Sequence, residues 1–176
     1  MKSGRKPQDR DREDGLRKIF ELRQANHNRT GPDATDEKGR LYELKSTTRD
    51  RVSSARDVGV DHLTKWRQLN WIFGRGNYKG RAFDFEQIYF LTPAQMEPWF
   101  SVMEAKLTRD DALFKRVLRV LAAHGFTPAE RDRVQLAFRR GVLLNDPKIP
   151  WGYVQTHGVR IDSNHARQLR KLVSRN

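Results

Sequence analysis

Apolar residues recur along this chain at two spacings, one typical of helices and the other of strands. Repeats near 3.6 residues predict amphipathic helices, whereas alternation predicts strands with one buried face. Residues 47–57 are polar and predict a loop, and the glycine-rich stretch 74–80 is interpreted as a hairpin turn. Helices are expected over residues 14–26, 58–70, 93–107, 110–124, 128–140 and 163–175. Strands are expected over residues 33–36, 40–46, 71–73 and 82–91.

The length of 176 residues favours a single domain over residues 1–176. Residues 1–14 are highly charged and are expected to be frayed and flexible. Residues 145–161 are expected to be irregular and extended, and Ser163 is a candidate N-cap for the last helix. Composition changes near residue 109, which indicates an added helical segment over 109–143.

A cluster of charged side chains is expected where the first two strands pair. Gly39 allows a tight turn between them, and the resulting hairpin brings Asp33 across from Glu43. The period of two along a strand then places Lys45 beside Glu43, facing the same side. The sequence therefore predicts two carboxylates and one lysine in a single pocket.

These residue types suit metal-dependent hydrolysis of a phosphodiester. Mg²⁺ prefers carboxylate oxygens and keeps some waters, so Asp33 and Glu43 are candidate ligands, with the backbone carbonyl of Leu44 as a third. Lys45 could then position the attacking water and neutralise charge that builds on phosphorus. The spacing alone arises often by chance, and a charged face on a surface strand is the alternative. The apolar opposite face, with Tyr42 and Leu44, favours the site.

Charge and composition narrow the classes of function. The chain has 35 Lys and Arg against 22 Asp and Glu, a net charge of +13, which suits a polyanionic partner and nucleic acid above all. The absence of cysteine excludes disulfides, thiolate nucleophiles and zinc–cysteine sites, and the five histidines lack metal-binding spacing. The sequence has neither an apolar run of about 20 residues nor a secretion signal. No membrane partner and a cytoplasmic location are therefore expected.

Three blocks, in order, resemble the PvuII-type restriction endonucleases of the PD-(D/E)xK nuclease superfamily. The first is Asp33-Ala34 with Tyr42-Glu43-Leu44-Lys45-Ser46. The second is Lys65-Trp66-Arg67-Gln68-Leu69-Asn70-Trp71-Ile72-Phe73. The third is Pro147-Lys148-Ile149-Pro150 with Tyr153-Val154, His157-Gly158 and Ile161. The resemblance covers residues 29–107 and 144–161.

The resemblance implies an α/β fold in which a mixed β-sheet core is flanked by helices. It implies a homodimer that grips double-stranded DNA and hydrolyses phosphodiesters with Mg²⁺, with Asp33 and Glu43 as metal ligands and Lys45 as the catalytic lysine. The function indicated is a type II restriction endonuclease that cuts at a short palindromic site, accompanied by a cognate DNA methyltransferase. A repair or junction-resolving nuclease on the same core and a non-catalytic nucleic-acid-binding protein are the alternatives.

This chain departs from the family in the loop after the catalytic strand. Residues 47–64 are about three residues shorter than the family's loop and lack its guanine-reading histidine cluster. The loop instead carries four charged candidates for DNA contact. They are Arg49, Arg51, Arg56 and Asp57. Arginine is the commonest reader of guanine, so Arg56 is favoured as a base reader, although phosphate contact is the commoner role for any one arginine.

Two further departures affect the expected site. Trp66 stands where the family has a tyrosine near the metal, and core packing is the favoured interpretation. The family's adenine-reading asparagine pair is replaced by Asn145-Asp146, of which Asn145 can still pair with adenine. Asp146 can accept from an exocyclic amine or simply form a turn, and Lys148 is a candidate DNA contact. The recognised sequence is therefore expected to differ from the family's.

Overall fold

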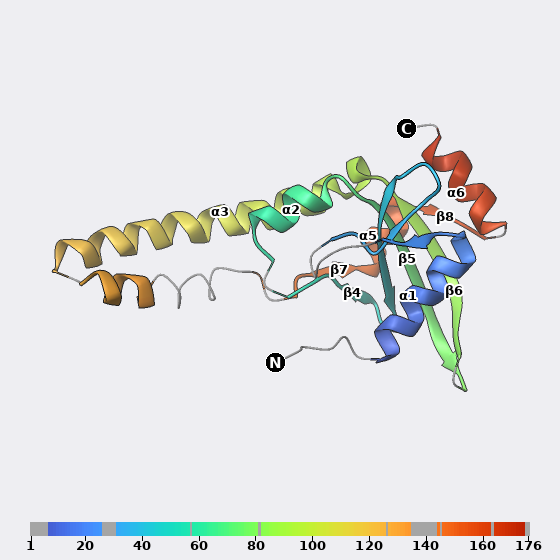
Figure 1. Ribbon diagram of the computed structural model, residues 1–176, viewed down its shortest axis with the longest axis horizontal. Coiled ribbons are helices and arrows are strands. Elements are labelled where there is room, and N and C mark those ends of the chain that lie inside the picture. The colour runs from blue at the N-terminus through green and yellow to red at the C-terminus, as the bar shows by residue number, and fades with distance from the viewer. Residues whose placement is uncertain are drawn as a thin grey trace.

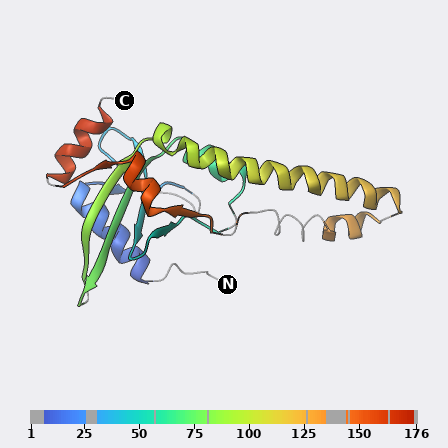
Figure 2. The ribbon, with the colours of Figure 1, turned by 180° about the vertical axis from the view of Figure 1, so that it is seen from behind.

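The computed structural model describes residues 7–25, 31–56, 58–80, 82–125, 127–134, 144, 146–162 and 164–174, with only the backbone of 7–10, 110 and 111. Its centre is a six-stranded sheet in the order β1-β2-β3-β5-β6-β8, with helices on both faces (Figures 1 and 2). The β3 and β5 strands are parallel, and the other pairs in this sheet are antiparallel. The expected α/β fold with a mixed sheet is thus confirmed.

The main-sheet strands are β1 (Arg23–Gln24), β2 (Ala34–Thr35), β3 (Leu41–Thr47), β5 (Asn70–Lys79), β6 (Ala82–Leu91) and β8 (Val159–Arg160). A second, two-stranded sheet pairs β4 (Arg51–Ser53) with β7 (Lys148–Pro150). The helices are α1 (Pro7–Phe20), α2 (Val60–Trp66), α3 (Pro93–Ala123), α5 (Trp151–His157) and α6 (His165–Val173), and residues 128–134 are also helical. None of the described helices is long and apolar enough to cross a membrane.

Alternation along the strands divides the buried side chains into two cores. Leu44 and Ile72 point to the face covered by α1 and α6. Trp71 and Phe73 point to the opposite face, where α2, α3 and α5 pack. The neighbouring β3 residues on that face are Glu43 and Lys45, as the registers of Glu43 with Trp71 and of Lys45 with Phe73 require. The predicted division of β3 into a charged and an apolar face is confirmed.

Most of the glycine-rich stretch 74–80 is strand where a turn was expected, because β5 continues through it to Lys79. An ideal Cβ on Gly74 would lie 2.5 Å from the Phe85 ring, so glycine permits close packing between strands at that position. The hairpin turn lies instead at Gly80, which has a φ of +64°. The expected strand 82–91 is confirmed as β6.

Several predicted boundaries were wrong. Helix α1 begins at Pro7, inside the segment expected to be frayed, and ends at Phe20. Helix α2 is only seven residues long, and the segment 145–161 contains α5 where extended chain was expected. Helix α6 confirms the C-terminal helix; its N-cap is Asn164, while Ser163 lies outside the described residues.

The two helices expected at 93–107 and 110–124 are one continuous helix, α3. Thr108 follows the first of these expected helices and was interpreted as its end. It does not end α3, because a single β-branched residue costs only a few tenths of a kcal/mol in a helix whose neighbours favour that structure. Beyond Leu107, α3 projects from the body as an arm, and residues 128–134 fold back beside it (Figure 1). Of the predicted segment 109–143, residues 126 and 135–143 lie outside the described residues.

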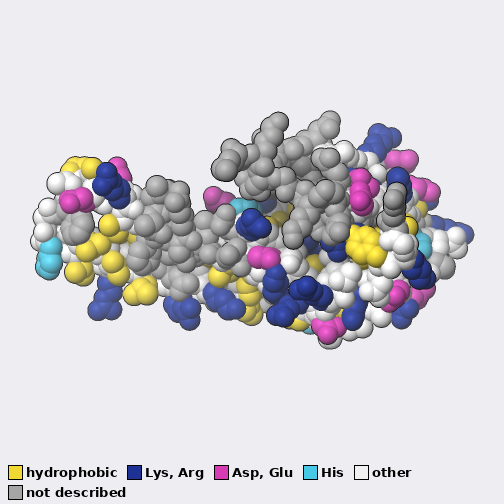
Figure 3. Space-filling view, turned by 90° about the horizontal axis from the view of Figure 1, so that it is seen from below, with side chains coloured by type: hydrophobic (Ala, Val, Ile, Leu, Met, Phe, Trp, Pro, Cys, Tyr) yellow, Lys and Arg dark blue, Asp and Glu magenta, His cyan; other side chains and the backbone are white. Residues whose placement is uncertain are grey.

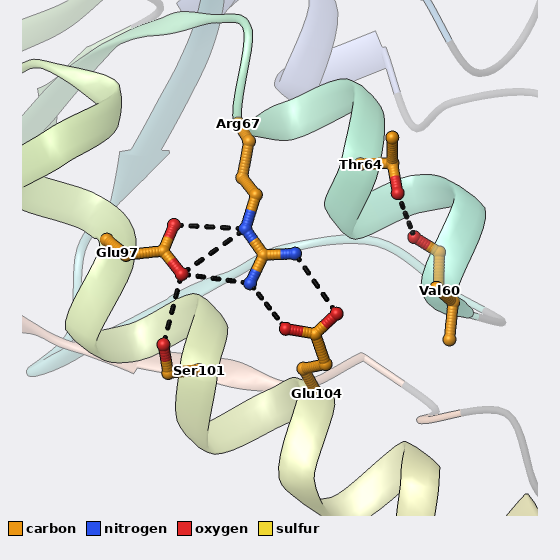
Figure 4. Close-up of polar contacts among 6 residues, drawn as sticks. All are labelled: Val60, Thr64, Arg67, Glu97, Ser101 and Glu104. Carbon is orange, nitrogen blue, oxygen red and sulfur yellow. Dashed lines mark hydrogen bonds and ion pairs between the residues drawn. The ribbon is translucent and has the colours of Figure 1, made fainter.

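A three-residue ion cluster anchors α2 to the root of this arm (Figure 4). Arg67, at the C-terminus of α2, donates to Glu97 at 2.9 Å and to Glu104 at 2.6 Å. Both carboxylates lie on α3, and Ser101 donates a further hydrogen bond to Glu97 at 3.0 Å. Glu97 and Glu104 raise the pKa of the Arg67 guanidinium, which is charged in any case. The cluster fixes α2, which follows the polar loop, against α3.

Candidate active site

The β2–β3 hairpin is organised by one carboxylate, that of Asp36. It accepts hydrogen bonds from the Lys38 amide at 2.9 Å and the Arg40 amide at 3.0 Å. It also accepts from Arg40 Nε at 2.7 Å and from the Tyr42 hydroxyl at 2.9 Å. Gly39, with a φ of +76°, completes the turn as expected. This bonding pattern, an Asx turn, holds the two strands in register.

We expect Asp36→Ala to destabilise the hairpin. Its loss removes four hydrogen bonds and leaves the buried Tyr42 hydroxyl without its acceptor, at a cost of about 2–3 kcal/mol. Urea denaturation measures this loss. Asp36→Asn is the matched variant, since its remaining amide oxygen can still accept from the Lys38 and Arg40 amides, and a smaller loss is expected. An Asp36→Ala protein as stable as the wild type would contradict this role.

Three charged side chains converge beside the hairpin, as the sequence predicted. Asp33 and Glu43 are both buried, and the Lys45 ammonium lies 2.6 Å from Glu43 and 4.0 Å from Asp33. Asp33 is held by its own backbone amide, which donates to the Tyr42 carbonyl at 2.9 Å. Its carboxylate accepts from the Leu44 amide at 3.0 Å. Burial of two carboxylates beside a single lysine leaves one negative charge in excess.

Burial and mutual repulsion shape the titration of this cluster. Burial, then the charge of Asp33, raises the pKa of Glu43 to about 7, and Lys45 only partly offsets them. Burial alone would lower the pKa of Lys45, but the Glu43 and Asp33 carboxylates outweigh it and raise that pKa. Lys45 therefore keeps its proton at neutral pH and can act as a cation and hydrogen-bond donor.

The raised pKa of Glu43 predicts how the stability of the metal-free protein depends on pH. The folded state holds a proton on Glu43 up to about pH 7, whereas an unfolded Glu releases it near 4.5. The free energy of unfolding should therefore fall as pH rises from about 4.5 to 7, by roughly 2–3 kcal/mol. Thermal unfolding in EDTA tests this against Glu43→Gln, which should lack this fall. Parallel profiles for the two proteins would contradict it.

The donor set fits a hard divalent cation. The carboxylates of Asp33 and Glu43 both lie near Lys45, and the backbone carbonyl oxygen of Leu44 is a third candidate ligand. The N–H and C=O of one strand residue point to the same edge, so the Leu44 carbonyl faces the edge where its amide meets Asp33. Among the described residues no group of three or more His, Cys, Asp or Glu side chains could hold a metal. A site of two carboxylates and one carbonyl suits Mg²⁺, which keeps several of its waters.

The small sheet brings together two segments that are distant in the sequence. In this β4–β7 ribbon, Ser53 pairs with Lys148 and Arg51 with Pro150. Both strands alternate exposed, buried, exposed, so the side chains of Arg51, Ser53 and Lys148 share the outer face. Lys148 donates to Ser53 at 2.8 Å and forms an ion pair with Asp146. Three of the seven predicted DNA contacts thus lie together here: Arg51, Asp146 and Lys148.

The other predicted contacts lie around this ribbon. Arg49 is exposed in the turn between β3 and β4, where its amide donates to the Thr47 hydroxyl at 3.0 Å. Arg56 is exposed just after β4. Asp57 and Asn145 lie outside the described residues. Asp146 has a φ of +53°, which suits the turn considered for it.

The residues that hold the ribbon in place were not predicted from the sequence. Arg75 lies 2.9 Å from Asp50 and over the Trp151 ring, with 5.8 Å between the guanidinium carbon and the ring centroid. The Trp151 amide donates to the Asp50 carbonyl at 2.8 Å. Ser53 was also missed, because the three residues of β4 are too few to give a periodic signal for a strand. No local pattern links Arg75 to Asp50, which is 25 residues earlier in the chain.

Trp66 packs in the core, as favoured from the sequence. It is 4% exposed, and its ring meets the Trp71 ring edge-on at a centroid distance of 5.5 Å. Its carbonyl accepts a hydrogen bond from Trp71 Nε1. Trp71 is the register partner of Glu43 on the neighbouring strand, so this aromatic group lies beside the charged cluster on the same face of the sheet.

A mixed sheet in which Glu43 and Lys45 of the central strand β3 lie beside Asp33, the residue before β2, is an arrangement suited to a nuclease. Comparison with family models agrees with this class. The model for restriction endonuclease PvuII matches residues 16–116, more than half of the chain. The chain therefore belongs to the restriction endonuclease PvuII family, whose members are nucleases that bind DNA. The match includes the hairpin, the charged cluster and the root of the arm.

Proposed function

We propose that this protein is a Mg²⁺-dependent type II restriction endonuclease that cuts both strands of DNA at a short palindromic site. The observation that carries the proposal is the convergence of Asp33, Glu43 and Lys45 at one buried point, in a chain that belongs to a restriction endonuclease family. The net charge of +13 suits a polyanionic substrate.

Each residue of the cluster has a distinct task in this proposal. Asp33 and Glu43, with the Leu44 carbonyl, bind Mg²⁺, which when bound polarises the scissile phosphate and stabilises the leaving oxygen. Lys45 stays protonated because its two carboxylate neighbours raise its pKa. It therefore cannot take a proton from the attacking water; it orients that water as a donor and neutralises charge on the phosphate.

The ribbon is proposed to read the DNA bases. A two-stranded ribbon fits the major groove, and the outer face of β4–β7 offers a guanidinium, a hydroxyl and an ammonium. Arg51 and Lys148 can donate to guanine, while Asp146 can accept from an exocyclic amine. Arg49, Arg56, Asp57 and Asn145 complete the set of proposed contacts. This set contains no histidine, so the recognised sequence should differ from one read by histidines.

A palindromic site requires two copies of the active site related by a twofold axis, so we propose a homodimer. A nuclease of this specificity would also destroy the DNA of its own host. A cognate DNA methyltransferase is therefore the expected partner in a restriction system within the cytoplasm.

The test is digestion of long, unmethylated DNA with Mg²⁺, followed by sequencing of the fragment ends. The proposal predicts ends that share one palindrome, and the same data give the positions of the cuts. Ends without a shared sequence, or cleavage confined to branched or mismatched DNA, would overturn the restriction assignment and leave a nuclease of another kind. Binding without cleavage would overturn the enzyme assignment.

A further inference from the structure

The outer half of α3 presents a cationic surface that the proposed site does not use. Residues 112–123 contain three cations and no carboxylate. Leu113, Arg116, Arg119 and Val120 are all exposed and lie on one side of the helix at spacings of three, four and seven residues. We call these four residues the arm edge. Figure 3 shows Lys and Arg side chains alternating with hydrophobic ones along one long edge of the arm.

The arm edge faces away from the side chains that hold α3 in the fold. Met96, Met103 and Leu107 form the buried stripe of the helix, on a different side from Arg116. Leu113 is 58% exposed and Val120 is 54% exposed, so neither side chain takes part in packing α3 against the sheet. Neither Arg116 nor Arg119 forms an ion pair with another described residue. The edge therefore carries cations that the described fold does not neutralise.

The root of the arm is tied to the proposed DNA-reading ribbon. Trp99 Nε1 donates to the Lys148 carbonyl on β7 at 3.2 Å. Arg67 fixes α2 to the same part of α3 through Glu97 and Glu104. DNA bound to the ribbon would therefore lie close to the root of the arm. From Leu107 to Ala123 the helix rises about 24 Å, the length of about seven base pairs.

We propose that the arm edge binds phosphates of the duplex that flanks the cleavage site. Arg116 and Arg119 supply the charge, while Leu113 and Val120 contact the apolar sugars between phosphates. The inference rests on the proposed function, since it extends the same DNA beyond the bases that the ribbon reads. Phosphate contacts of this kind carry no sequence information but position the protein and increase its affinity.

A second copy of the chain is a less suitable occupant of this surface. Pairing two arm edges would bring Arg116 and Arg119 of both copies together, with no carboxylate among residues 112–123 to separate them. Like charges without partners are costly to desolvate at an interface. The phosphates of DNA, in contrast, carry charge that is complementary to these arginines.

The test is the salt dependence of binding to a duplex in EDTA, measured by fluorescence anisotropy, so that cleavage plays no part. The double variant Arg116→Gln/Arg119→Gln is compared with wild type and with Arg167→Gln/Lys171→Gln. This control removes the same charge from α6, on the opposite face of the sheet. Each lost phosphate contact lowers the slope of log K against log salt by about 0.9. The arm variant removes two contacts from each protomer of the proposed homodimer, so its slope should fall by about 3.6, whereas the slope of the control should hardly change.

Equal slopes for the arm variant and wild type, or equal losses for the arm variant and the control, would overturn the inference. Loss of dimerisation by the arm variant in sedimentation would also overturn it, because the edge would then be a subunit contact. Failure of the wild type to cleave DNA would count against the proposed function alone. A reduced slope for the arm variant would still support phosphate binding in that case.

Discussion

Asp33→Asn is expected to abolish cleavage while leaving the fold intact. The Asp33 carboxylate accepts from the Leu44 amide at 3.0 Å, and an amide oxygen can accept the same bond. The substitution removes one of two buried negative charges, and with it a proposed metal ligand. Loss of one electrostatic stabiliser of this kind typically costs about 10²–10³ in rate, so single-turnover cleavage should fall at least that far.

The thermal stability of the metal-free Asp33→Asn variant should not fall with its activity. Removing a buried charge beside Glu43 relieves repulsion and desolvation, so the metal-free variant should unfold at a temperature equal to or above that of the wild type. The rise in unfolding temperature that Mg²⁺ gives the wild type should disappear. Asp84→Asn is the control, since Asp84 pairs with Lys79 far away in the β5–β6 hairpin. Retained cleavage, or a retained response to Mg²⁺, would contradict the assigned role.

Trp71→Ala is expected to cause the largest loss of stability. Trp71 is fully buried, stacks on Phe73 at a centroid distance of 5.7 Å, and meets Trp66 and Phe100 at 5.5 and 6.0 Å. Truncating a buried tryptophan leaves a large cavity and costs about 3–5 kcal/mol, a large share of the total stability of a single domain.

Denaturant unfolding at equilibrium measures this loss. Val60→Ala serves as the control because Val60 is 48% exposed on α2, and its substitution should change stability by less than about 1 kcal/mol. A Trp71→Ala protein that loses no more than this control would show that the aromatic cluster does not support the sheet. At temperatures where it is folded, the variant should also cleave more slowly, because Trp71 lies beside Glu43 in the sheet.

The charged cluster could be predicted because its determinants are local. A tight turn at Gly39 and the two-residue period of β3 together fix which side chains face Asp33, and both follow from the sequence. The β6 strand was predicted to the residue for a similar reason, since its apolar and aromatic residues form one local run bounded by Gly80 and by Pro93.

The ribbon could not be predicted because its determinants are distant in sequence. Ser53 and Lys148 are 95 residues apart, and each three-residue strand is too short to give a periodic pattern. Gly74 was misassigned for a related reason. Glycine marks both turns and close packing, and only the position of the Phe85 ring on the neighbouring strand distinguishes the two.

The most direct measurement of the central claim is the cleavage of supercoiled plasmid DNA by wild type and by Lys45→Ala, each with Mg²⁺ and with EDTA. We expect linear DNA only for the wild type with Mg²⁺, because the carboxylates need a metal and the phosphate needs the Lys45 cation. Circular dichroism would confirm that the variant is folded. Cleavage by a folded Lys45→Ala protein, or by the wild type in EDTA, would contradict the claim that this cluster is the active site.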